Sequence, residues 1–381
     1  MNLDELQKQI KQLTLNSGAK LVGVGSRERL EKAPSSANMG YCLPEAKSCI
    51  IWVYPNPINA LENYFAKKER MSIKQFQYFA YTSAWTTAQR IKQFIEDNTE
   101  YKAFAVIPNG KYRKEEGSFS FLEADLAYPD FSLRYGAVAA GLGHLGWSGN
   151  LVTKEYGGSL YLAGVLTTAP LKPDPMAEEN YCNKCKVCFQ ACTTGYFDKD
   201  KEEDIQEVII GGYKEIYAKR GTYSKCGIGC AGLVGVSEDN SWSTWTANHI
   251  CIKQYPNQEW KAKPFIRKQI MKKILIDKNT PSELRKFNKR IVKSFAKVAA
   301  HENTGLRPLK DTNPRCGNCS FICVADHKKR IELLELLKNS GKLYLDEEGR
   351  EFVRQITKNG EEVTYYPPTE KEFFSNLDKK E

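Results

Sequence analysis

The amino-acid sequence predicts an α+β protein in which a sheet-forming first half is followed by a cysteine-rich second half. Two observations predict this fold class. Helical and strand-like apolar patterns alternate through the first half, as they do in a domain with a central sheet. Seven of the twelve cysteines then gather in two short arrays, within residues 182–192 and 316–323. With 381 residues, 41% of them hydrophobic, the chain can bury a full core.

The expected elements follow from local patterns. Apolar residues at helical spacing predict an amphipathic helix over residues 3–15 and a long helix over residues 73–97. Short apolar runs predict buried strands at 20–25, 48–54, 103–107 and 160–166. Beyond residue 328 the pattern predicts another helix and then charged, strand-like segments.

The first cysteine array has the spacing C-x2-C-x2-C-x3-C, which is that of bacterial ferredoxins. In this spacing three thiolates hold one [4Fe–4S] cluster and the fourth reaches a second cluster. The arrays therefore predict two clusters. The ligands of the first would be Cys182, Cys185, Cys188 and Cys323. The ligands of the second would be Cys192, Cys316, Cys319 and one thiolate from elsewhere.

Zinc and disulfides are the alternatives for these cysteines. The first array has four cysteines within eleven residues, and the second adds three at similar spacing. Together they are too many for one tetrahedral zinc site. None of the four histidines stands at zinc-finger spacing. A disulfide framework is disfavoured because the chain is large and has no secretory features. Cys42 and Cys49, in the first half, are expected to be buried apolar residues.

The N-terminus and the charge bear on location and partners. The first residues are acidic and lack the apolar segment of a signal peptide, and no run has the length of a membrane span. The prediction is a cytoplasmic protein without a membrane partner. The net charge of +10 comes mostly from lysines, which favours solvated helix faces over a polyanion-binding surface.

Residues 140–153, with the sequence AGLGHLGWSGNLVT, precede a glycine-containing strand, a Thr-Thr-Ala-Pro-Leu stretch and then the first array. This order resembles the cobalamin-dependent iron–sulfur reductases, which include the epoxyqueuosine reductases and the reductive dehalogenases. The likeness covers about residues 120–195 and 316–323, and it is only topological before residue 110.

The resemblance implies a domain organisation. Residues 1–175 would form a nitroreductase-like α+β domain that binds a corrinoid. Residues 176–330 would form a ferredoxin-like domain with two [4Fe–4S] clusters, interrupted by a long insertion at about 197–312. Residues 331–381 would form a C-terminal extension.

The resemblance also implies contacts with the corrinoid. Glycine lets a backbone approach a flat macrocycle closely. The residues implied are Gly141, Leu142, Gly143, Gly146, Ser148, Asn150 and Thr167. No D-x-H-x-x-G sequence is present, so no histidine is expected below the cobalt.

The proton donor is a departure from the family. Where epoxyqueuosine reductases have an aspartate, this chain has Ala127, and Tyr128 and Asp130 are the nearest candidates. Reductive dehalogenases use a tyrosine, and a tyrosine hydroxyl can supply a proton. The alternative is that both residues only cap or pack the helix expected near Ser132. Arg134 would pair with a corrinoid or substrate anion, or form an ordinary surface ion pair.

The insertion should supply the eighth cluster ligand. Cys226 is favoured over Cys230, because a single cysteine of the relatives precedes a similar glycine-containing turn, and Cys251 is third. The insertion also holds Trp242 and Trp245, which would cover a corrinoid or substrate pocket or simply anchor a loop.

Two further departures from the family are present, of which the first alters a turn and the second bears on the substrate. The proline that usually follows the last cysteine of each array is replaced by Thr193 and Val324. The 58 residues after Cys323 cannot hold the helical-repeat tail that serves tRNA in epoxyqueuosine reductases. The tRNA function is therefore disfavoured.

The resulting hypothesis is a cytoplasmic oxidoreductase. A low-potential donor such as ferredoxin or flavodoxin would reduce the two clusters, and a Co(II)/Co(I) corrinoid would reduce a small organic substrate. One alternative is an epoxyqueuosine reductase acting on tRNA. Another is a two-cluster electron-transfer protein, or a reductive activator of a corrinoid protein.

Overall fold

A four-stranded antiparallel sheet organises the N-terminal half of the chain. In the computed structural model its order is β1 (Leu21–Ser26), β2 (Ser48–Pro55), β8 (Leu160–Thr167) and β3 (Ala103–Val106). The structure describes residues 1–108, 112–113, 128–197, 205–221, 223–251, 280–301, 309, 312–357 and 359–377. A fully antiparallel sheet with helices packed on it is an α+β arrangement, so the predicted mixture of helices and sheet is confirmed.

Strand β2 is the centre of this half because both of its faces are covered. Ile50 and Trp52 join one apolar cluster with helices α1 (Leu3–Asn16) and α3 (Met71–Asn98). Cys49 and Ile51 join a second cluster with helix α4 (Leu133–Ala139) on the other face. Successive side chains of a strand point to opposite faces, so a strand covered on both sides is a continuous apolar run.

The other elements predicted for this half are confirmed with small shifts of their ends. Helix α1 begins one residue after Asn2, whose side chain accepts a hydrogen bond from the Glu5 amide at 2.9 Å. Helix α2 (Ile58–Phe65) follows β2. The remaining short elements are 3-10 helices Glu28–Leu30, Ser35–Ala37 and Met39–Tyr41, and strands β4 (Tyr112–Arg113), β5 (Tyr128–Pro129), β6 (His144–Leu145) and β7 (Leu151–Val152).

Each of the two cysteine arrays includes a four-residue helix, which holds one of its cysteines. Helix α5 (Val187–Gln190) and helix α10 (Asn318–Phe321) lie against each other, and helix α11 (His327–Lys338) packs against α5. The Asn318 side chain donates a hydrogen bond to the Ala191 carbonyl at 3.1 Å and ties the arrays together. Apolar residues of all three helices belong to the same cluster as α1 and β2, so the arrays are built onto the sheet core.

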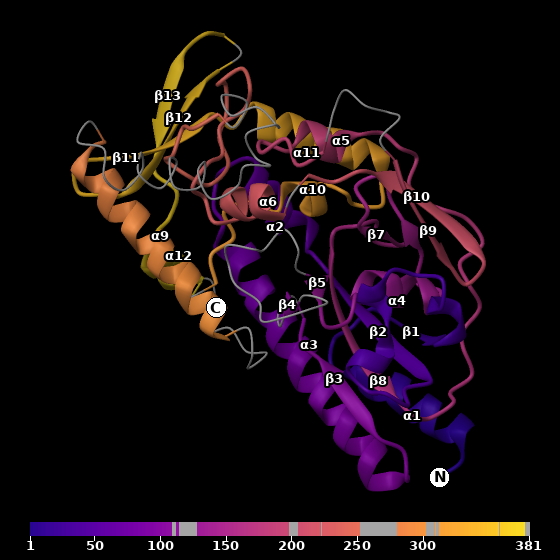
Figure 1. Cartoon of the computed structure of the whole chain (residues 1–381). Coiled ribbons are helices and arrows are strands. Elements are labelled where there is room, and N and C mark those ends of the chain that lie inside the picture. Colours follow the sequence, from indigo (N-terminus) through magenta and orange to yellow (C-terminus); the bar gives the residue numbers. More distant parts are fainter. Residues whose placement is uncertain are drawn as a thin grey trace.

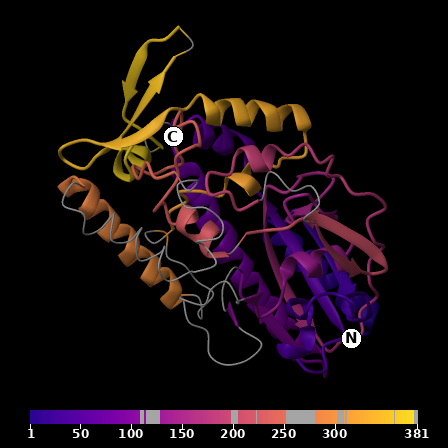
Figure 2. The ribbon, with the colours of Figure 1, turned by 45° about the horizontal axis from the view of Figure 1, so that its top comes forward.

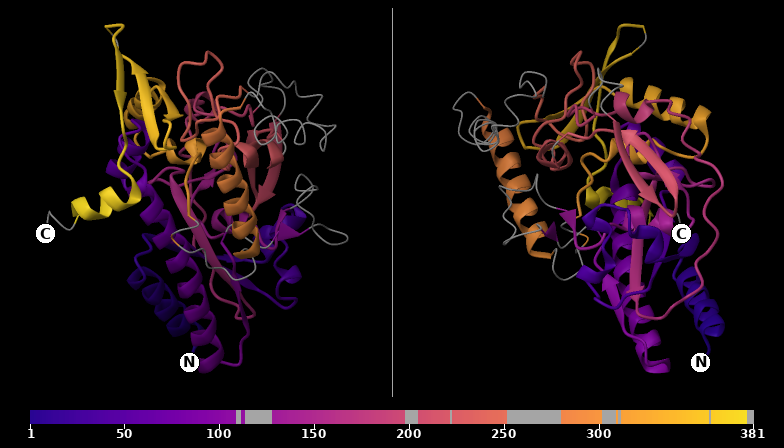
Figure 3. Two further views of the ribbon diagram at one scale, coloured as in Figure 1. Left: turned by 90° about the vertical axis from the view of Figure 1, so that its left-hand side faces the viewer. Right: turned by 45° about the vertical axis from the view of Figure 1, so that its right-hand side comes forward.

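The remaining elements surround this core (Figure 1). They are β9 (Ile205–Ile210), β10 (Tyr213–Ala218), α6 (Tyr223–Cys230), α9 (Ser282–His301), β11 (Lys342–Leu345), β12 (Glu351–Ile356), β13 (Glu362–Tyr365) and α12 (Glu370–Leu377). Helix α3 separates α9 from the sheet in Figures 1 and 2. Strands β12 and β13 project from one end of the molecule (Figure 3). Within the described residues, no helix combines the length and apolarity needed to cross a membrane.

Candidate functional site

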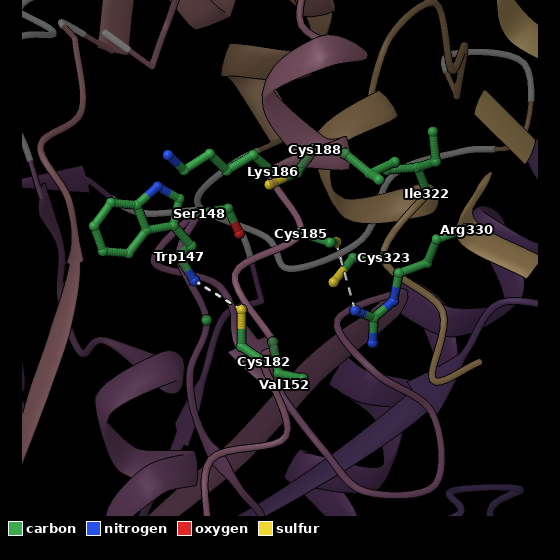
Figure 4. Close-up of a pocket in the computed structure, with 12 residues that line it drawn as sticks. Trp147, Ser148, Val152, Cys182, Cys185, Lys186, Cys188, Ile322, Cys323 and Arg330 are labelled. Carbon is green, nitrogen blue, oxygen red and sulfur yellow. Dashed lines mark hydrogen bonds between the residues drawn. The ribbon is translucent and has the colours of Figure 1, made fainter. Parts of the chain in front are cut away.

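Four cysteines from both arrays surround one pocket. Cys182, Cys185 and Cys188 line it together with Cys323, more than a hundred residues further along the chain (Figure 4). These are the four residues that the spacing assigns to the first cluster. Their role as ligands stays a prediction.

Left-handed backbone brings the three thiols of the first array to the same side. Lys184 and Lys186, between the cysteines, have φ angles of +54° and +58°. Such values tighten the turn at each step, at a cost that a residue other than glycine bears only in a specific loop. On the other side, a Cβ on Gly158 would lie 3.3 Å from the Cys323 sulfur. The absence of a side chain there leaves room for that thiol.

The pocket supplies hydrogen bonds to two of its sulfurs. The Trp147 amide, within the glycine-rich segment 140–153, donates to Cys182 Sγ at 3.2 Å (Figure 4). The Arg330 guanidinium, on α11, lies 3.8 Å from Cys185 Sγ and also donates to the Ala325 carbonyl at 3.0 Å. Arg330 is 3% exposed. Donors of this kind stabilise negative charge on sulfur.

The position of Arg330 beside the cysteine pocket was not predicted from the sequence. The only signal for it is a basic residue seven positions after Cys323, and the neighbouring Lys328 and Lys329 give the same signal. Its side chain returns along α11 to the pocket, so its contact with the first array depends on how α11 packs on α5.

Five other cysteines form a second group beside the first. The Cys319 thiol interacts electrostatically with those of Cys192, Cys226 and Cys316. Cys230 completes the group through its contact with Cys316. The Cys226 and Cys230 sulfurs are 3.8 Å apart, one turn apart on α6. Cys230 also donates to Cys316, and this hydrogen bond lowers the pKa of Cys316 to about 7. The structure therefore brings both favoured candidates for the eighth ligand to the second group.

Burial makes the protein alone a poor environment for thiolates. It raises the pKa of Cys188, Cys192 and Cys323, with the neighbouring sulfurs of the same group adding to the effect. Metal-binding cysteines must be deprotonated. Since burial penalises that charge, a bound cation would be needed to hold these groups as thiolates. Among the described residues, no three Cys, His, Asp or Glu side chains are grouped closely enough for a single metal ion.

The glycines predicted to face a corrinoid make close contacts with their own chain. Gly141 has φ +74°, and a Cβ there would lie 2.0 Å from the Pro175 carbonyl oxygen. Gly143 has φ +152°, and a Cβ would lie 2.2 Å from the Val152 carbonyl oxygen. Packing within the chain is thus a sufficient reason for both glycines. The Leu142 side chain lies close to Gly23 of β1.

Thr167 is also occupied within the fold. Its hydroxyl donates to the Lys102 carbonyl at 2.9 Å and accepts from the Ala169 amide at 3.1 Å. It is completely buried at the end of β8. These contacts connect the sheet to the linker that leads to the first array.

The loop 146–150 does border the cysteine pocket. Gly146, Trp147 and Ser148 line the pocket. Arg220 holds this loop by donating to the Ser148 carbonyl at 2.6 and 2.9 Å and to the Asn150 side chain at 3.0 Å. The indole nitrogen of Trp147 is buried, and the part of the chain that the structure describes offers it no hydrogen-bond acceptor. The loop therefore has one buried donor for which the described residues provide no partner.

The predicted anion partner Arg134 also serves this loop. Its guanidinium donates to the Gly149 carbonyl. Burial, together with the like charge of Arg220, lowers the pKa of Arg134 to about 10. The described contacts of Arg134 are thus structural ones.

Of the two proton-donor candidates, the structure describes Asp130 and the backbone of Tyr128. The Tyr128 backbone pairs with Arg113 in the β4–β5 ladder, while its side chain lies outside the described residues, as does Ala127. Asp130 is 6% exposed and has an interaction partner. Helix α4 begins just beyond it, with Ser132 as its N-cap residue. The catalytic role of both stays a prediction.

A buried ion pair connects the glycine-rich segment to β10 and makes stability depend on pH. His144 Nδ1 lies 2.5 Å from Glu215 and Nε2 lies 3.0 Å from the Ala177 carbonyl, so both nitrogens face acceptors. The Glu215 hydrogen bond, opposed by burial, raises the pKa of His144. The stabilisation is complete below the unfolded pKa of about 6.5 and is lost as pH rises through the folded pKa.

We therefore expect the urea midpoint of the wild type to fall more than that of His144→Gln between about pH 6 and about pH 9. The matched control is His249→Gln, because burial lowers the pKa of His249. Parallel pH profiles for the wild type and His144→Gln would contradict the role of this pair.

Comparisons with known proteins give partial matches. No family model matches the chain. A segment of 59 residues is 46% identical to an epoxyqueuosine reductase of Gloeobacter violaceus and covers 15% of this chain and 18% of that protein. A segment of 126 residues is 32% identical to a tetrachloroethene reductive dehalogenase of Dehalobacter restrictus and covers 30% of this chain and 22% of that protein. The matches span less than a quarter of the length of these relatives.

Solved structures of epoxyqueuosine reductases and reductive dehalogenases are distantly similar to this chain. An epoxyqueuosine reductase from Bacillus subtilis has 18% identity and a TM-score of 0.33 over 51% of this chain and 53% of that one. A catabolic reductive dehalogenase in complex with 3-bromo-4-hydroxybenzoic acid has 14% identity and a TM-score of 0.41 over 77% of this chain and 35% of that one. The sequence matches confirm, over these segments, the resemblance to both kinds of reductase.

Proposed function

We propose that this chain is an oxidoreductase that carries two [4Fe–4S] clusters and delivers their electrons, through a corrinoid, to a small organic substrate. One observation carries the proposal: Cys182, Cys185 and Cys188 of the first array share a pocket with Cys323 of the second. Its matched relatives are reductases. An external low-potential donor such as ferredoxin or flavodoxin would supply the electrons.

The donor set fits iron–sulfur clusters. A tetrahedral zinc ion takes four sulfurs at about 2.3 Å from one point. Here nine cysteines fall into two neighbouring groups, and the first surrounds a pocket with four thiols. A pair of clusters bound there would supply one-electron transfer. The chain itself would set their potentials, since the Trp147 amide and Arg330 favour the extra negative charge of the reduced state.

The corrinoid rests on the sequence resemblance and on one structural observation. At Gly141, Gly143 and Thr167 the chain's own atoms give a structural reason for the residue, so these positions add no separate support for a macrocycle contact. The indole nitrogen of Trp147, within the loop 146–150, has no partner among the described residues, and this supports a polar ligand at that loop. A corrinoid bound there would carry the reductive chemistry.

Epoxyqueuosine reduction on tRNA is the second candidate. The observation in its favour is that most of the matched relatives are epoxyqueuosine reductases. An electron-transfer protein or reductive activator is the third, because two clusters alone suffice for it.

Anaerobic purification and reconstitution with iron, sulfide and cobalamin would test the proposal. We expect about eight iron atoms per chain and retention of one corrinoid, read from metal analysis and the visible spectrum. Iron without retained cobalamin would replace the corrinoid enzyme with the electron-transfer function. A protein that takes up zinc and no iron would overturn both. Restoration of queuosine in a strain that accumulates epoxyqueuosine would select the tRNA substrate.

A further inference from the structure

A cavity distinct from the cysteine pocket lies between the start of α3, helix α9 and strand β12. It has a volume of about 1500 Å³, including the open space at its mouth, and residues 367–370 form part of its wall. In Figures 1 and 2, α9 lies on the far side of α3 from the sheet. Residues of both helices line the cavity.

Two buried arginines in this cavity have unused hydrogen-bond donors. Arg70 is 9% exposed and Arg315 is 6% exposed. They share one carboxylate, since Arg70 Nη2 lies 2.9 Å and Arg315 Nη1 lies 3.3 Å from Glu351. Arg70 Nη1 and Arg315 Nε are buried, and no acceptor for them lies among the described residues. A charged donor left unpaired in the interior is costly, so the arrangement indicates a missing acceptor.

The balance of charge indicates that the missing acceptor is an anion. Five basic residues and three carboxylates line the cavity. Lys74 pairs with Glu370 at 2.7 Å, whereas Arg70 and Arg315 have only Glu351 between them among the described residues. One positive charge at this pair is therefore without a counter-charge there.

Aromatic rings hold both guanidiniums in place. The Arg70 guanidinium lies 5.1 Å from the centre of the Trp245 ring, and that of Arg315 lies 4.5 Å from the centre of the Phe287 ring. Trp245 is itself fixed by a 3.0 Å hydrogen bond from its indole nitrogen to the Tyr64 carbonyl. Donors that are already fixed lose little entropy when a ligand binds. Trp245 thus both anchors its loop and lines a cavity.

We propose that this cavity binds a phosphate group on Arg70 and Arg315, with Arg290 of α9 closing the site from its rim. Guanidinium groups that approach from the residue before α3, from α9 and from the segment before Cys316 suit a tetrahedral anion. A planar carboxylate, by contrast, is matched by a single guanidinium fork. The phosphate belongs to a small phosphate ester or to an RNA backbone, which share this chemistry. The site stands independently of the reductase proposal, although Arg315 directly precedes Cys316.

Calorimetry on the full chain with reconstituted clusters would test the site. Inorganic phosphate should bind saturably at one site per chain, and acetate should not. Arg70→Gln and Arg290→Gln should each weaken phosphate binding about tenfold, the size of one lost charge-assisted contact. Glu351→Gln should strengthen it, because the competing carboxylate charge is removed. A merely structural role for these residues would not produce that opposite sign.

Lys289→Gln is the matched control, because Lys289 is an exposed cation next to Arg290 on α9 that does not line the cavity. It should leave phosphate binding unchanged. Competition with inorganic phosphate then identifies the source of the phosphate. Stronger competition by adenosine monophosphate indicates a small phosphate ester, and stronger competition by a short RNA stem–loop indicates an RNA backbone. Equal binding of phosphate and acetate, or no saturable phosphate binding by a protein with intact circular dichroism, would overturn the site. Arg290 is exposed, so its variant tests the site even where Arg70→Gln fails to fold.

Discussion

Replacing Cys323 with serine is expected to remove one cluster and about half of the iron, leaving about four iron atoms per chain. Cys323 is the only member of the second array that lines the pocket of the first. Its loss would leave three thiols around that pocket, while the group around Cys316 keeps all of its cysteines. Iron and sulfide analysis with low-temperature EPR of the reduced protein would measure the change.

Cys42→Ser is the control for this experiment, because Cys42 is a half-buried cysteine in the N-terminal half, outside both groups. It should keep the full iron content. If Cys323→Ser also keeps its full iron content, the exchange of ligands between the arrays is refuted. The two-cluster proposal would then need a different partner for the first three cysteines.

Replacing Gly141 with alanine is expected to lower the free energy of unfolding by about 2–4 kcal/mol, the combined size of a left-handed backbone penalty and an overpacked contact. Gly141 has φ +74°, and the added Cβ would meet the Pro175 carbonyl oxygen at 2.0 Å. Backbone atoms cannot move aside as a flexible side chain can. Urea unfolding in the absence of cobalamin measures the loss of stability without any contribution from a bound corrinoid.

Gly212→Ala separates the two contributions. Gly212 has φ +84° with no atom within 4 Å of the added Cβ, so only the backbone penalty of about 1 kcal/mol is expected. If the two variants lose the same stability, the contact with Pro175 is not the cause. If Gly141→Ala loses stability only when cobalamin is present, the glycine serves the corrinoid instead of the fold.

Local patterns were sufficient for most elements of the N-terminal half. The periodicity of residues 3–15 and the apolar runs at 20–25 and 48–54 correspond to α1, β1 and β2 within two residues. These patterns are decisive because each element buries a defined face, or both faces, against its neighbours. The order and antiparallel pairing of the strands depend on contacts between distant segments, which no local pattern specifies.

For the cysteine arrays, too, local spacing predicts part of the arrangement and contacts between distant segments decide the rest. The spacing within residues 182–192 determines which thiols can face a common centre, because a short loop can turn in only a few ways. The sequence could not decide whether Cys226 or Cys230 faces Cys316, because the two are four residues apart and lie on one turn of α6. In the structure Cys230 makes the hydrogen bond to Cys316. The resemblance assigned Gly141 and Gly143 to a corrinoid, and that role stays a prediction; the structure adds contacts with residues 175 and 152, which no local pattern specifies.

The sequence by itself thus determined the α+β class, the main elements of the sheet domain and the grouping of cysteines by spacing. Only the tertiary structure decided that Arg330 faces the first cysteine group and that Arg70 and Arg315 meet at one carboxylate. The physical reason is the range of the forces involved. Backbone turns and burial patterns act between near neighbours in the chain, whereas a buried charge is positioned by whichever distant segments exclude water around it.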